Sequence, residues 1–97
     1  MAEPAPSAAD LALIDPDGHF RLRLLEDRRM LAGGDRSEAG LAAVIHRLAG
    51  AAGTFGYGEV GAIALGLDDR LAEGGRIGAD DLARLVAALD RAIARSA

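Results

Sequence analysis

Apolar residues recur at the spacing of an α-helix in four separate stretches of this chain, and glycine-containing breaks divide the stretches. Cysteine is absent and only 3% of the residues are aromatic, so the core must come from many small and medium aliphatic contacts. Closely packed helices provide such contacts. We therefore expect an all-α fold. The clearest stripe is formed by Leu82, Leu85, Val86, Leu89 and Ile93.

The first predicted helix runs to about Leu31, and two starts are possible for it. Asp15 and Pro16 can be its cap and first position, or Asp-Pro-Asp-Gly at residues 15–18 can form a turn, with the helix beginning near Gly18. Its apolar face is the least regular of the four because Asp27 lies on it, so we expect part of that face to be near water. The preceding residues 1–10 are rich in Ala, Pro and Ser without periodicity, which predicts a loose, flexible lead.

Three more helices are predicted by the breaks in the remaining sequence. The Gly-Gly-Asp break at residues 33–35 precedes a second helix, which either Asp35 or Ser37 can cap. The third helix spans residues 60–71, and the break EGGRIG separates it from the fourth. Four amphipathic helices with short connections predict an antiparallel up-down-up-down four-helix bundle over residues 11–97.

The overall charge and the hydropathy exclude several classes of partner. A formal net charge of −4 argues against attachment to nucleic acid, which needs a basic surface. No apolar run approaches the roughly 20 residues of a membrane span, and the first residues lack the order of a signal peptide. With 97 residues and no cysteine, we expect one cytoplasmic domain without membrane contact.

His46 occupies an unusual position in the second predicted helix. At about 100° per residue, the apolar side chains of residues 39–55 fall within one arc, and His46 points about 140° away from its centre. The arc is formed by Leu41, Val44, Ile45, Leu48, Ala52 and Phe55. The imidazole should therefore face solvent.

The surroundings of His46 on that helix are small and uncharged, whereas an exposed helix face ordinarily carries charged residues. We call these neighbours the docking platform: Ala42, Ala43, Ala49, Gly50 and Gly53. Another helix of this chain could cover the platform, with His46 as a hydrogen-bonded interhelical residue. The lack of apolar bulk instead favours docking of another protein and reaction at the imidazole.

The segment HRLAGAAGTFG, residues 46–56, resembles the phosphoacceptor segment of histidine-containing phosphotransfer (HPt) domains. The core pattern of that family is His-x-x-Lys-Gly with another glycine six residues on, and His46, Gly50 and Gly56 match it. The resemblance extends through residues 59–74, and the length and helical organisation agree with it. It implies a phosphorelay intermediate that accepts a phosphoryl group on His46 from the phosphoaspartate of a receiver domain and passes it to another receiver. Response regulators and hybrid histidine kinases carry such receivers, and the resemblance places Mg²⁺ on the receiver.

One departure from the family pattern concerns charge. Ala49 stands where the family usually has lysine, so the usual cation beside the phosphoryl group is missing. Two arginines are candidates to replace it. Arg47 is long enough to curl over His46, and Arg70 would lie roughly level with His46 if the third helix runs antiparallel to the second.

A docking module and a metal-dependent helical enzyme are the two alternatives to the phosphorelay. The chain has no nucleotide-binding glycine loop and no carboxylate cluster for Mg²⁺, so we expect no kinase activity of its own and no bound cofactor. One alternative is a docking module that binds or inhibits a kinase or response regulator without being phosphorylated. Ala49 is consistent with it, because the lysine usual in the family is missing at this position. A metal-dependent helical enzyme would need clustered histidine and carboxylate ligands, which the sequence lacks.

Overall fold

The computed structural model describes residues 6–33 and 37–96, and in this part of the chain every regular element is an α-helix. The helices are α1 (Ala8–Ile14), α2 (His19–Gly33), α3 (Glu38–Ala51), α4 (Gly58–Ala72) and α5 (Ala79–Arg95). The predicted all-α class is confirmed, and the four predicted helices correspond to α2, α3, α4 and α5. None of the described helices combines the length and the apolar character needed to cross a membrane.

The short helix α1 begins inside the segment that we expected to be a loose lead. Its start is stabilised by a capping box, in which the Ser7 hydroxyl accepts a hydrogen bond from the Asp10 amide at 3.2 Å. The Asp10 carboxylate accepts one from the Ser7 amide in return, at 3.1 Å. Leu11 is buried, which anchors the helix to the core. Residues 8–10 are therefore helical, whereas residues 1–5 lie outside the described part.

Side-chain caps define the starts of two longer helices. The Ser37 hydroxyl accepts a hydrogen bond from the Gly40 amide at the start of α3, as one of the two predicted caps would. Asp35, the other candidate, lies outside the described residues. Asp81 caps α5 from inside its first turn, because its carboxylate accepts a hydrogen bond from the Gly78 amide at 3.0 Å.

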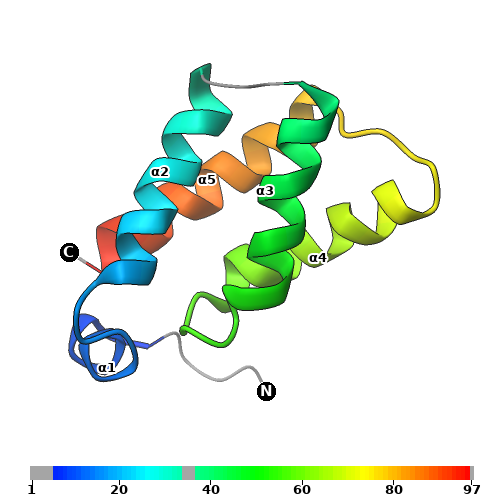
Figure 1. Cartoon of the computed structure of the whole chain (residues 1–97). Coiled ribbons are helices and arrows are strands. Elements are labelled where there is room, and N and C mark those ends of the chain that lie inside the picture. The colour runs from blue at the N-terminus through cyan, green and yellow to red at the C-terminus, as the bar shows by residue number, and fades with distance from the viewer. Residues whose placement is uncertain (1–5, 34–36, 97) are drawn as a thin grey trace.

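The helices pack in neighbouring pairs around one core (Figure 1). Helix α3 packs along α4, α2 packs along α5, and α4 also contacts α5. The four longer helices supply most of the buried apolar side chains, which include Leu24, Leu31, Val44, Ile45, Leu48, Val60, Leu67, Leu82, Leu85 and Leu89. Each helix thus turns its apolar face inward, as expected of amphipathic helices.

The connection between α3 and α4 determines how these two helices meet. Gly56 has φ of +91°, a left-handed conformation that glycine adopts without strain. The next residue, Tyr57, is buried, and the ring of Phe20 stacks on Phe55 with centroids 4.4 Å apart. A Cβ on Gly61 would lie 3.0 Å from the backbone nitrogen of Gly53, so glycine at position 61 permits close approach of α4 to the end of α3. This contact places α4 beside the face of α3 that carries His46.

Candidate functional site

His46 lies on α3 with 80% of its side chain exposed, as the helical spacing predicted. Its Nδ1 is 3.2 Å from both carboxylate oxygens of Asp68, which belongs to α4. The Asp68 side chain is 27% exposed, so the carboxylate is more enclosed than the ring that it contacts. Within the described residues, Asp68 is the one side chain that hydrogen-bonds His46.

The contact with Asp68 selects one tautomer of the neutral imidazole. An ionised carboxylate can only accept hydrogen bonds, so Nδ1 must carry the proton that it donates to Asp68. The lone pair of the neutral ring is then on Nε2. A nucleophilic nitrogen therefore stands at the exposed edge of a ring that a carboxylate on another helix orients.

The docking platform divides into an open part and a covered part. Ala43, Gly50 and Gly53 are exposed, and a Cβ added at either glycine would meet nothing within 4 Å. Ala42 and Ala49 are half-buried, and Ala49 packs against the core. The alternative in which another helix covers the platform is confirmed only in part: His46 does hydrogen-bond to a neighbouring helix through Asp68, but Ala43, Gly50 and Gly53 stay exposed in the described part of the chain.

We expected that Arg47 could extend over His46, but its side chain points to another helix. Its guanidinium donates a hydrogen bond to Asp27 on α2, and the two side chains form an ion pair. Asp27 is buried rather than near water, and this partner is what allows a carboxylate on the apolar face of α2. Burial raises the pKa of Asp27 above its ordinary value and outweighs the opposing effect of Arg47. Arg47 thus connects two helices, and this arrangement contradicts its predicted place beside a phosphoryl group.

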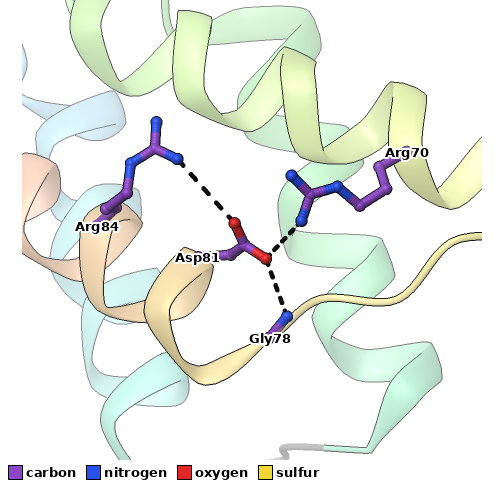
Figure 2. Close-up of polar contacts among 4 residues, drawn as sticks. All are labelled: Arg70, Gly78, Asp81 and Arg84. Atoms are coloured by element: carbon purple, nitrogen blue, oxygen red, sulfur yellow. Dashed lines mark hydrogen bonds and ion pairs between the residues drawn. The ribbon is translucent and has the colours of Figure 1, made fainter.

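Arg70 is also committed elsewhere (Figure 2). Its guanidinium donates a hydrogen bond to Asp81 on α5, which Arg84 approaches from the other side. The hydrogen bond from the Gly78 amide, together with the two arginines, lowers the pKa of Asp81 despite partial desolvation. Arg70 therefore connects α4 to the start of α5. The prediction that it lies beside His46 is wrong.

Asp68 is the site residue that the sequence analysis missed, although the register of the two helices contains a signal for it. In an antiparallel pair joined near residue 57, positions equally far from that point lie level, and 46 and 68 are both eleven residues away. The sequence predicts Arg70 roughly level with His46, but Arg70 lies two positions beyond Asp68 on α4. Two positions turn the side chain by about 200°, away from His46 and toward α5.

The described residues contain no group of three or more histidine and acidic side chains that could hold a metal ion. Comparison with protein-family models, with curated proteins and with solved structures gave no match to this chain. The site is therefore interpreted from its own geometry: an exposed, oriented imidazole beside open glycine positions.

Proposed function

We propose that this chain is a phosphorelay intermediate of the HPt type, which accepts a phosphoryl group on His46 from one receiver domain and donates it to another. The observation that carries the proposal is the exposed His46 ring, whose Nδ1 contacts Asp68 and whose Nε2 is directed away from that contact. We further propose that α2 to α5 form the up-down-up-down bundle of that family and that the protein works in the cytoplasm, where its receivers would be found.

The chemistry of the proposed transfer needs little from this chain besides the placed nucleophile. The Nε2 lone pair attacks the phosphorus of an aspartyl phosphate, and the P–O bond breaks with its electrons leaving on the receiver's carboxylate. Charge neutralisation and in-line geometry dominate such transfers. We assign the Mg²⁺ that supplies the neutralisation to the receiver.

The open glycines support the docking that this transfer requires. A receiver must bring its aspartyl phosphate to bonding distance of Nε2, which excludes bulky side chains around the ring. Gly50 lies one turn after His46 and has open space where a side chain would begin. A surface of this kind admits the partner's loops around the ring.

A second candidate function is a docking module that binds a kinase or receiver without being phosphorylated. The ion pairs of Arg47 and Arg70 favour it, because they hold both candidate cations away from the position of a phosphoryl group. Ala49 removes the third possible cation.

Incubation with a panel of phosphorylated receiver domains from the same organism separates the two functions. A carrier acquires label that is lost in acid and kept in base, and His46→Gln acquires none. A receiver that binds tightly without labelling the protein would instead establish the docking module. His19→Gln is the matched control, because it removes the other histidine and should be labelled like the wild type.

A further inference from the structure

We propose that Asp68 makes His46 a rapid donor of the phosphoryl group rather than a store for it, by holding the proton on Nδ1 throughout the transfer. This inference rests on the proposed phosphorelay function and concerns the regulation of the same site. Its basis is the contact of Nδ1 with both carboxylate oxygens at 3.2 Å. Asp68 touches neither phosphorus nor the receiver, so it is a positioning residue.

Acceptance of the phosphoryl group places a positive charge on the ring. Nε2 uses its lone pair for the new N–P bond while Nδ1 keeps its hydrogen, so the phosphorylated ring is a cation. The carboxylate of Asp68 is adjacent to that N–H and stabilises the cation. Loss of the proton to water is correspondingly disfavoured.

Release depends on the same proton. When the N–P bond breaks, its electrons return to Nε2. A ring that still carries the Nδ1 hydrogen leaves as neutral imidazole. A ring that has lost this hydrogen would leave as an imidazolate anion, which is a much poorer leaving group. Asp68 therefore promotes the return of the phosphoryl group to a receiver by the same contact that promotes acceptance, as microscopic reversibility requires.

The charges around the site also favour rapid release of the phosphoryl group. The phosphoryl group would stand on the opposite edge of the ring from the Asp68 carboxylate, and like charges repel. Arg47 is paired with Asp27 on α2, and Arg70 is paired with Asp81 on α5. Neither arginine is placed to retain the phosphoryl group, so the phosphorylated state should be short-lived and should pass its group on.

The test uses Asp68→Ala, with Asp69→Ala as the matched control, because Asp69 is the adjacent acidic residue and is exposed. Nitrogen-15 NMR of the imidazole should show the Nδ1–H tautomer in the wild type and in Asp69→Ala, and a shift toward Nε2–H in Asp68→Ala. Circular dichroism checks that each variant is folded.

The lifetime of phosphohistidine is measured after loading with phosphoramidate, a phosphoryl donor whose P–N bond breaks as ammonia leaves. In Asp68→Ala the lifetime near neutral pH should lengthen about tenfold, and transfer to a receiver should slow about tenfold, as the loss of one charge-assisted hydrogen bond implies. The transfer rate should also begin to fall at lower pH than in the wild type, because the Nδ1 proton is lost more easily.

The outcomes separate this inference from the proposed function. An unchanged tautomer, lifetime and transfer rate in Asp68→Ala, with receivers still exchanging label with His46, would overturn the role of Asp68 and leave the phosphorelay standing. Failure of every receiver to exchange with wild-type protein, although phosphoramidate loads His46, would overturn both.

Discussion

The guanidinium of Arg47 on α3 donates a hydrogen bond to the buried carboxylate of Asp27 on α2, although its neighbour His46 faces solvent. Replacing Arg47 leaves a buried carboxylate without its cation, and an unpaired buried charge is costly. We expect Arg47→Ala to lower the free energy of unfolding by about 1–3 kcal/mol in a denaturant titration. The lifetime of phosphohistidine should not change. Arg29→Ala on the exposed side of α2 is the control, with an expected effect within about 0.5 kcal/mol.

The same pair predicts a pH dependence of stability. The pKa of Asp27 is raised in the folded protein, so its contribution to stability is present below the ordinary value of 3.8 and is lost as the pH rises through the folded value. Asp27→Asn should remove this decline of the unfolding free energy with rising pH. Arg47→Ala should extend the decline to higher pH, because the pKa of Asp27 rises further without its cation. Unfolding titrations at several pH values measure both effects. Parallel pH profiles for wild type and Asp27→Asn would contradict the raised pKa.

Gly50 allows stability and transfer to be separated. A helical glycine with open space should be stabilised by alanine, so Gly50→Ala should raise the unfolding free energy by up to about 1 kcal/mol. Gly50→Gln should retain the fold but strongly slow phosphoryl transfer, because its side chain occupies the space needed by a receiver. Gly66→Gln on α4 is the matched control, since that glycine is also helical and open. Equal transfer rates in the two glutamine variants would refute the docking platform.

A side chain at Gly56 should destabilise the fold, for two reasons. Its φ is +91°, and an added Cβ would lie 2.6 Å from the Leu11 side chain. Gly56→Ala should therefore cost about 1–3 kcal/mol of stability. Gly74 has a similar φ of +84°, but an added Cβ there would meet open space. Gly74→Ala therefore measures the backbone strain alone and should lower the stability by less. Thermal unfolding of the two variants compares the costs, and an equal loss would mean that contact with Leu11 contributes nothing.

Asp81 should stabilise the start of α5 in a pH-dependent manner (Figure 2). Its pKa is lowered, chiefly by the hydrogen bond from the Gly78 amide, so its contribution is present above the ordinary value of 3.8. The contribution is lost as the pH falls through the folded value. Asp81→Ala should lower the melting temperature at neutral pH, and the difference from wild type should shrink in acid. Asp80→Ala, which changes the preceding exposed carboxylate, should have the smaller effect.

The sequence alone was sufficient for the features that are local along the chain. The helical spacing of Val44, Ile45 and Leu48 predicted both the buried face of α3 and the exposure of His46, because a helix has a fixed rotation per residue. The Gly-rich segments predicted where the helices end. The start of α1 was not predicted, since a helix of only seven residues leaves little periodic signal.

The partners of the charged side chains were decided only by the tertiary structure. Asp68 contacts His46 and Arg70 contacts Asp81, although the two α4 residues are only two positions apart. Which residue of α4 faces α3 depends on the register and rotation of the two helices, which the close approach at Gly61 helps to fix. Asp27 likewise became a buried residue because α3 brings Arg47 to it. Pairings of this kind depend on the packing of whole helices, and a shift of two residues turns a side chain by about 200° to another neighbour.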